Sequence, residues 1–152
     1  MTYDDLDFTI LASKPLNYWD YIQTDSLLNL HIQRTDFPDE MVFIVYHQVN
    51  ELIFKMILWE LKQVAETTKL EVEFFTDKLM RISRYFDMLT SSFSIMKDGM
   101  DVEQYNKFRH SLSPGSGFQS AQYRKIEFAS TELINLIDNR FRDTIDRDTP
   151  FE

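Results

Sequence analysis

Apolar residues recur at three- and four-residue intervals over most of the chain, which is the spacing of one face of an α-helix. The longest such segment, residues 41–66, contains no Gly or Pro. Just before it, Asp36 can cap a helix, Pro38 suits the first helical turn, and Asp39 and Glu40 place negative charge at the positive end of the helix dipole. The pattern therefore predicts a long helix from about Pro38 to Glu66, buried on more than one side.

Four further helices are predicted from the same spacing. They cover approximately residues 16–30, 72–96, 102–111 and 119–137. Gly99 is a natural stop for the second of these, and the last carries Tyr123, Ile126, Leu133 and Ile137 on its inward face. The only turn-rich segment is Ser113–Gly117, ahead of the last helix.

The fold class that follows is all-α, a bundle of four or five helices with two long members and an N-terminal arm. The chain of 152 residues contains only 3 Gly and 4 Pro, too few for many short strands and turns. We expect an arm at 1–14, one helical domain at 15–139 and a charged tail at 140–152.

The charge balance narrows the range of partners. A formal net charge of −9 argues against nucleic acid and against an anionic membrane surface. The absence of cysteine excludes disulfides, a thiolate nucleophile and Cys-ligated metal sites within these residues. The acidic first residues do not resemble a targeting signal, and no apolar run approaches the roughly 18 residues of a membrane span. We expect a cytoplasmic protein.

His47 is the first candidate for chemistry, because it lies within the long apolar helix, one turn after Phe43 and near Asn50, Glu51 and Phe54. It can be a core histidine that is bonded to a carbonyl or to Glu51. Alternatively, it faces a pocket, where an imidazole can exchange a proton near neutral pH. His31 and His110 lie at helix ends and are expected to be surface or capping residues.

Arg109 follows Tyr105 by one helical turn, so the two side chains can project together toward the glycine-containing loop. A guanidinium binds a carboxylate through two parallel hydrogen bonds, and a tyrosine hydroxyl can add a third. The alternative is a surface arginine paired with an acidic residue. The loop itself could bind an anion through backbone N–H groups, but Ser116 has no obvious base beside it, and no metal-ligand spacing is present.

Two stretches read together resemble one family. The first runs from Asp39 to Leu52 and continues through Lys55 to Glu60-Leu61. The second comprises Phe108-Arg109, Leu112, Pro114, Ser116-Gly117-Phe118-Gln119-Ser120, Gln122-Tyr123-Arg124 and Ile126-Glu127. This pattern closely resembles the tryptophan 2,3-dioxygenase family. The resemblance spans about residues 16–127 and corresponds to the N-terminal part of a family member.

The resemblance implies a helical haem enzyme, typically a homotetramer, that inserts both atoms of O2 across the indole C2–C3 bond of L-tryptophan and gives N-formylkynurenine, a step of tryptophan catabolism through the kynurenine pathway. His47 would be the distal histidine that contacts the indole N–H, and Phe43 would line the indole pocket. Arg109 and Tyr105 would hold the substrate carboxylate. Leu112 would complete the apolar wall, and Ser116 and Gly117 would lie over the haem edge. Tyr18, Tyr21 and Ile22 match a segment that reaches a neighbouring subunit's pocket.

Three departures from the family pattern are visible. Pro38 stands where a histidine usually precedes the Asp-Glu pair, and Ile53 replaces a tryptophan. The proximal haem histidine belongs to the C-terminal half of the family, and neither His31 nor His110 aligns with it. Either a second polypeptide supplies that half, or the chain is a haem-free module that binds an indole or aromatic amino acid, or it has a purely structural role.

Overall fold

The computed structural model describes residues 17–142, and these residues are helical with connecting loops, which confirms the all-α prediction. They belong to two compact units, one ending at Ile32 and the other beginning at Gln33. The predicted arm at 1–14 and the tail beyond residue 142 lie outside the described residues, so the predicted domain boundaries stay predictions.

In the first unit, α2 (Tyr18–Tyr21) and α3 (Thr24–Leu28) replace the single helix predicted for residues 16–30. Asn17 caps α2 by accepting the Asp20 N–H at 2.9 Å. The break occurs at Gln23, whose φ of 54° is left-handed. Helical geometry cannot continue through such a residue, so the continuous-helix prediction was wrong here.

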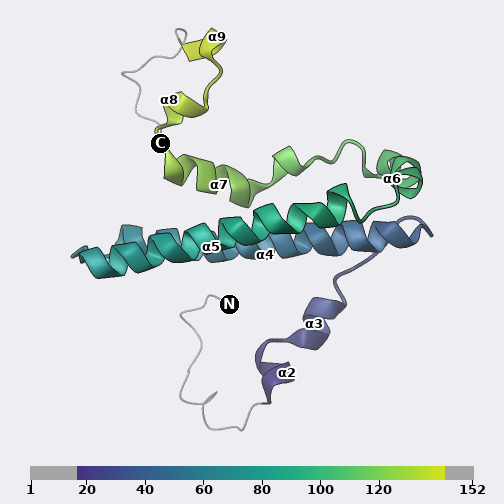
Figure 1. Cartoon of the computed structure of the whole chain (residues 1–152), viewed down its shortest axis with the longest axis horizontal. Helices are drawn as coiled ribbons and strands as arrows, with labels where there is room; N and C mark the ends of the chain where they lie inside the picture. Colours follow the sequence, from purple (N-terminus) through teal and green to yellow (C-terminus); the bar gives the residue numbers. More distant parts are fainter. Residues whose placement is uncertain (1–16, 143–152) are drawn as a thin grey trace. The chain divides into compact units, whose positions relative to one another are not determined.

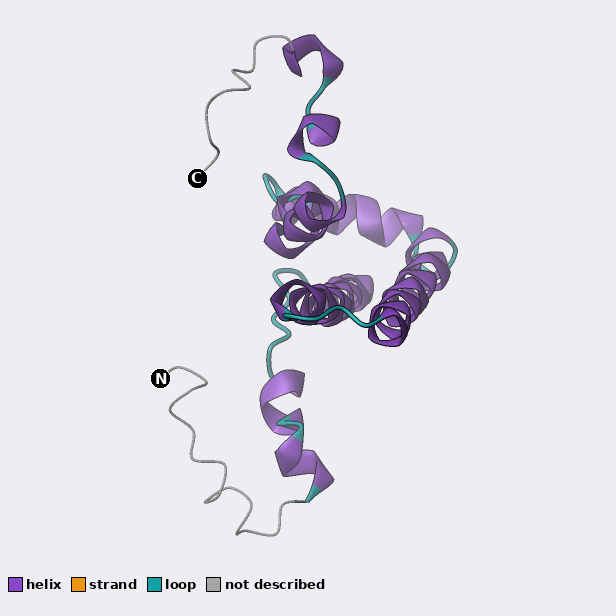
Figure 2. Cartoon of the chain, turned by 90° about the vertical axis from the view of Figure 1, so that its left-hand side faces the viewer, coloured by secondary structure: helices purple, strands orange, loops and turns teal. Residues whose placement is uncertain are grey.

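The second unit is built on a hairpin of two long helices. α4 (Pro38–Glu66) and α5 (Val72–Lys97) run side by side in opposite directions (Figures 1 and 2). Both were predicted closely, and Pro38 occupies the first helical turn. Asp36 does not cap α4, because Phe37 holds that position without a side-chain hydrogen bond. A Cβ on Gly99 would lie 2.6 Å from the Ile95 carbonyl oxygen, so the chain leaves α5 at a residue that must be small.

The remaining elements follow α5. They are α6 (Val102–Phe108), the 3-10 helices η2 (Arg109–Leu112) and η3 (Gly117–Gln119), α7 (Ala121–Ser130), α8 (Leu133–Leu136) and α9 (Asn139–Arg142). Both α6 and α7 pack against α4. The predicted helix at 102–111 tightens into η2 after Phe108, and the predicted last helix ends at Ser130, because Thr131 is extended.

The hydrophobic core of this unit is small. Ile53 and Ile57 of α4 and Ile126 of α7 are buried together, and six partly buried residues pack around them: Phe54, Leu58, Leu61, Ile82, Tyr85 and Leu89. Much of α4 remains uncovered, and by length and apolar composition alone it could cross a membrane, with a mean hydropathy of 1.3 over its best window. The expectation that no apolar run approaches the length of a membrane span therefore does not hold for α4 by this criterion. Core helices of soluble proteins meet the same criterion.

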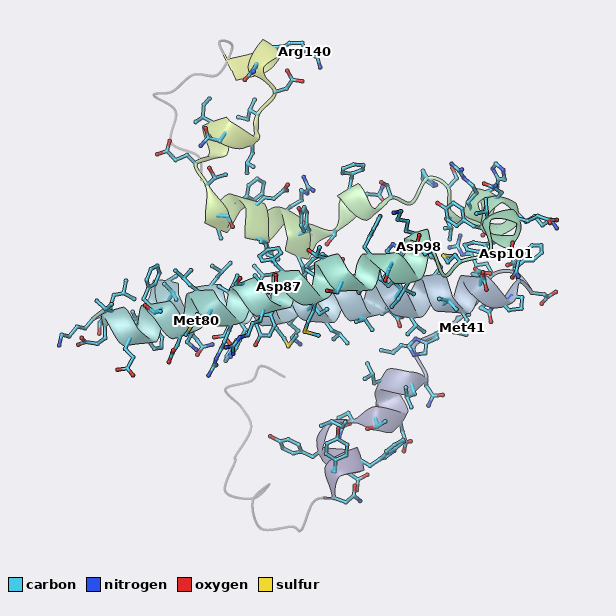
Figure 3. The ribbon with its side chains drawn as sticks, in the orientation of Figure 1. Met41, Met80, Asp87, Asp98, Asp101 and Arg140 are labelled. Atoms are coloured by element: carbon cyan, nitrogen blue, oxygen red, sulfur yellow. The ribbon has the colours of Figure 1, made fainter. Side chains whose placement is uncertain are left out.

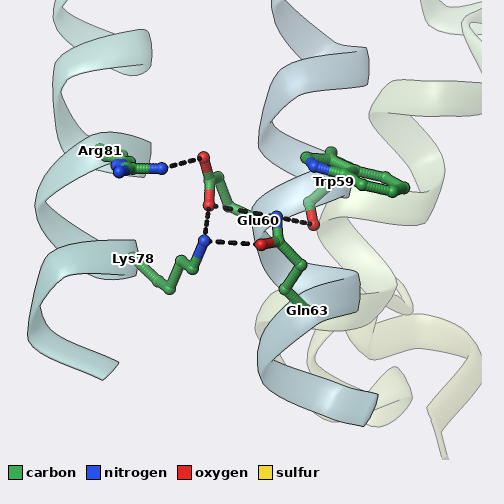
Figure 4. Close-up of polar contacts among 5 residues, drawn as sticks. All are labelled: Trp59, Glu60, Gln63, Lys78 and Arg81. Carbon is green, nitrogen blue, oxygen red and sulfur yellow. Dashed lines mark hydrogen bonds and ion pairs between the residues drawn. The ribbon is translucent and has the colours of Figure 1, made fainter. Parts of the chain in front are cut away.

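A buried ionic network joins α4 to α5 (Figure 4). The Lys78 ammonium donates to Glu60 Oε2 and to Gln63 Oε1, each at 2.7 Å, and Arg81 Nη1 lies 3.3 Å from Glu60 Oε1. Burial raises the pKa of Glu60, but the hydrogen bonds and charges of Lys78 and Arg81 outweigh it, so the pKa lies below its usual value. The network thus links the C-terminal half of α4 to the N-terminal half of α5.

Candidate functional site

Four aromatic side chains form a cluster between α4 and α6, which we call the ring cluster: Phe43, His47, Tyr105 and Phe108. The ring centroids of Phe43 and His47 are 4.1 Å apart, and those of Phe43 and Tyr105 are 6.3 Å apart. Phe108 is fully buried and meets Phe43 edge-on at 5.7 Å. Residues predicted from two distant segments of the sequence therefore meet in one place.

The hydrogen bond of His47 determines which of its nitrogens is free. Nδ1 lies 2.8 Å from the carbonyl oxygen of Phe43. Because a carbonyl can only accept, Nδ1 carries the proton, and in the neutral imidazole Nε2 is then an acceptor. Both readings of His47 hold, since the ring is bonded to a carbonyl and also lines a pocket. Glu51 is not its partner, because Glu51 Oε2 accepts from Gln122 Nε2 at 2.8 Å.

Arg109 begins η2 at the far side of the ring cluster. Its guanidinium carbon lies 5.6 Å from the centre of the Tyr105 ring, which is a cation–π distance. Tyr105 is half-buried, whereas the Arg109 side chain is exposed. Within residues 17–142 the guanidinium makes no ion pair with a carboxylate. Its role in binding a carboxylate stays a prediction.

A cavity of ≈ 390 Å³ opens beside His47. Its wall comes from α4, α5, the glycine-containing loop and the start of α7: Tyr46, His47, Asn50, Glu51, Phe54, Phe93, Ser116, Gly117, Phe118, Ser120, Tyr123 and Arg124. Ser116 caps η3 through its hydroxyl, which accepts the Phe118 N–H at 3.3 Å. A Cβ on Gly117 would meet nothing within 4 Å, so this loop leaves open space at the cavity.

Two polar atoms in the wall of this cavity were not singled out from the sequence. Asn50 Oδ1 and Arg124 Nε are buried and have no hydrogen-bond partner among the described residues. Arg124 is otherwise held in place, because Nη1 lies 2.7 Å from Glu127 Oε2 and the guanidinium stacks over Tyr123 at 5.2 Å. Because both atoms are inaccessible to solvent, they do not face the open space of the cavity.

For the other predicted residues, the structure gives the exposure of the side chain but no contact that tests the predicted role. Leu112 is half-buried in η2, and its part in an apolar wall stays a prediction. Tyr18, Tyr21 and Ile22 are exposed in the first unit, with 76%, 74% and 41% of their surface accessible, and their reach into another subunit also stays a prediction. His110 is exposed as expected, whereas His31 is half-buried. No group of three or more potential metal ligands occurs among residues 17–142.

A family model described as tryptophan 2,3-dioxygenase matches residues 9–148. The chain belongs to the tryptophan 2,3-dioxygenase family. The tryptophan 2,3-dioxygenase of Ruegeria sp. strain TM1040 is 40% identical over 115 residues, which are 74% of this chain and 40% of that protein. The enzyme of the same name from Exiguobacterium sibiricum is 41% identical over 119 residues, or 76% of this chain and 42% of its own length.

The chain thus spans about two-fifths of the length of the tryptophan 2,3-dioxygenases that it matches. Two of its departures from the family pattern, at Pro38 and Ile53, lie within α4. Pro38 begins α4, and Ile53 is 4% exposed in the core cluster with Ile126. Neither residue lines the cavity beside His47.

Proposed function

We propose that this chain supplies the substrate pocket of a haem-dependent dioxygenase that converts L-tryptophan and O2 to N-formylkynurenine in the cytoplasm. The observation that carries the proposal is the ring cluster, which links an imidazole with a free Nε2 to an unpaired guanidinium through Phe43 and Tyr105. An indolyl amino acid needs a flat apolar surface, a partner for the indole N–H and a cation for its carboxylate. The cluster and Arg109 together offer these three.

At the indole end, Phe43 provides a ring face and His47 provides Nε2. Since Nδ1 is committed to the Phe43 carbonyl, Nε2 accepts a hydrogen bond from the indole N–H. This bond orients the indole ring and gives His47 a position from which it can hold a proton of the substrate.

The cytoplasmic assignment rests on the absence of cysteine, which suits a reducing compartment.

At the other end, the Arg109 guanidinium pairs with the amino-acid carboxylate, and the Tyr105 hydroxyl adds a hydrogen bond. The stacking of Arg109 on Tyr105 fixes the direction of the guanidinium without using its N–H donors. No carboxylate of residues 17–142 pairs with these donors, so they can make a two-point contact with the substrate carboxylate.

The cavity beside His47 is where we place the haem edge. Ser116 and Gly117 give it an open wall, and Arg124 brings a positive charge that can attract a carboxylate such as a haem propionate. Haem, when bound, supplies the oxygen chemistry, and this chain orients the substrate. No residue from 17 to 142 is assigned to the iron.

The exposed apolar surface of α4 is an argument that a further polypeptide belongs to the assembly. An apolar seam follows a heptad spacing along this helix: Val42, Val45, Val49, Leu52, Met56 and Trp59. All but the half-buried Val45 are classed as exposed, from 38% for Met56 to 60% for Trp59. Exposed apolar surface of this extent marks an interaction site. We propose that helices equivalent to the rest of the family fold cover the seam in a homotetrameric assembly.

Substitution of Arg109 tests this function. Arg109→Ala should weaken L-tryptophan binding by about 1.5–3 kcal/mol, the usual size of a charge-assisted contact. Titration calorimetry on the purified assembly measures the affinity, and Arg84→Ala, at an exposed position of α5, is the matched control. An unchanged affinity would remove Arg109 from the carboxylate site.

The absorption spectrum of the same preparation separates the alternatives. A Soret band together with a second polypeptide on a denaturing gel supports the dioxygenase. A colourless single species that binds an aromatic amino acid would instead be a binding module, and one that binds nothing would be a structural protein.

A further inference from the structure

The segment that carries Tyr105 and Arg109 is tied to the start of α4 at its N-terminal end. Asp39 Oδ2 accepts the Asp101 N–H at 2.7 Å, and the Asp39 N–H lies 3.3 Å from Gln104 Oε1. Asp101 is the N-cap of α6 and accepts the Gln104 N–H at 3.0 Å. Figure 3 shows Asp101 at the same end of the hairpin as Met41, where α4 begins. One carboxylate thus fixes where α6 starts.

A second tie holds the other end of the segment. Arg34 Nη1 donates to the carbonyl oxygen of Ser111 at 2.9 Å, across 77 residues of sequence. Ser111 lies within η2, two residues after Arg109, and its hydroxyl donates to the Phe108 carbonyl at 2.7 Å. The guanidinium of Arg34 therefore binds the same 3-10 helix that contains Arg109.

Arg34 itself is held by a buried carboxylate. Glu40 is 1% exposed, and its two oxygens accept the backbone N–H groups of Arg34 at 2.9 Å and of Thr35 at 2.7 Å. The Thr35 hydroxyl donates to the same carboxylate. These hydrogen bonds hold the backbone of the loop before α4 in place. The Arg34 side chain therefore extends toward η2 from a fixed position.

Between the two ties, the segment contacts α4 through aromatic rings, with Tyr105 and Phe108 against Phe43. Ring stacking tolerates sliding and tilting, whereas hydrogen bonds require aligned donors and acceptors. The aromatic contacts therefore hold α6 against α4 without setting where the Arg109 guanidinium lies along it. The distance from that guanidinium to Phe43 and His47 depends on the hydrogen-bonded ties.

We infer that Arg34 and Asp39 are positioning residues that set the Arg109 guanidinium at the carboxylate end of the indolyl amino acid. This inference rests on the proposed function and adds to it two residues that touch neither substrate nor cofactor. It assigns them to recognition of the carboxylate and not to recognition of the indole. A ligand without a carboxylate should therefore be insensitive to their loss.

The experiment compares L-tryptophan with tryptamine, which has the same indole and ammonium groups but no carboxylate. Arg34→Met keeps the apolar stem of an exposed side chain and removes its donors, so it leaves no cavity in the core. We expect L-tryptophan affinity to fall about three- to tenfold, the equivalent of one hydrogen bond, while tryptamine affinity changes less than about twofold. Arg34→Lys, which restores one donor, should recover most of the L-tryptophan affinity.

Asp39→Ala provides an independent test of the other tie and should show the same selective loss. An unchanged ratio of the two affinities in Arg34→Met and Asp39→Ala overturns the inference, whether both affinities fall equally or neither falls. Such a result describes residues that serve only folding. A wild-type assembly that binds both ligands equally instead overturns the carboxylate clamp at Arg109, and with it the proposed function.

Discussion

Replacement of Lys78 by Met should destabilise the hairpin strongly. The Lys78 ammonium and the Glu60 carboxylate are 9% and 5% exposed and lie 2.7 Å apart. Removal of one partner from such a pair typically costs about 3–5 kcal/mol, because the other charge stays buried. Arg81 also contacts Glu60, but its side chain is 54% exposed and 3.3 Å away, so it compensates only in part. We expect a loss near the lower limit, about 3 kcal/mol.

The double variant Glu60→Leu, Lys78→Met removes both charges and leaves apolar side chains of similar size. It should lie within about 1 kcal/mol of the wild type, since apolar replacement of a buried ion pair is often neutral or stabilising. Urea unfolding of the chain followed by far-UV circular dichroism measures both differences. Lys62→Met is the matched control, because Lys62 pairs with Glu66 at 57% and 65% exposure and should change stability by less than about 0.5 kcal/mol.

The pH dependence checks the same mechanism from another direction. The pKa of Glu60 is lowered in the folded protein, so its stabilisation is complete above the unfolded-state pKa and disappears as the pH falls through the folded-state pKa. The gap between wild type and Lys78→Met should therefore narrow in acid, where protonation removes the buried charge. A Lys78→Met loss no larger than that of the Lys62 control, or a gap that widens in acid, would refute the reasoning.

Three further substitutions test the candidate site, the loop before α4 and the hydrophobic core. His47→Ala should impair turnover while the Soret band of the assembly is retained, and loss of that band would make His47 an iron ligand. The pKa of Glu40 is lowered because hydrogen bonds from Thr35 and Arg34 outweigh burial, so Glu40→Gln should cost about 1–3 kcal/mol at neutral pH in urea unfolding and progressively less in acid; a pH-independent loss would contradict this. Ile57→Ala at a fully buried position should cost about 2–5 kcal/mol, well above Ile95→Ala at a position 47% exposed, and equal losses would place Ile57 outside the core.

The long helices were predictable because local signals agreed along their whole length. α4 and α5 combine an unbroken apolar period with Pro38 at one start and Gly99 after one end, so their limits follow from sequence alone. The left-handed Gln23 had no such signal, since glutamine rarely adopts positive φ. The end of α7 at Ser130 was missed because apolar residues continue at helical spacing beyond the break.

The candidate site was predictable in part for a related reason. Phe43 with His47, and Tyr105 with Arg109, are pairs one helical turn apart, and the family resemblance suggested that the two pairs meet. The unsatisfied Asn50 Oδ1 and Arg124 Nε could not be found this way, because an unpaired buried atom is defined by every neighbour around it. Long-range hydrogen bonds such as Arg34 to Ser111 are equally invisible, since the chain offers many possible acceptors.

The two halves of α4 carry different tasks, and this division has a consequence for the site. Ile53, Ile57 and Glu60 join the C-terminal half to α7 and α5, whereas Phe43 and His47 belong to the N-terminal half, which meets α6. The core cluster around Ile57 is thus a separate group from the ring cluster, which has its own fully buried residue, Phe108. We expect the position of the Arg109 guanidinium along α4 to depend on the hydrogen bonds at the start of α4 and not on the packing of Ile57. A core-weakening change should lower the stability of the protein without altering the ratio of L-tryptophan to tryptamine affinity, and a shift in that ratio would mean that the two halves are coupled.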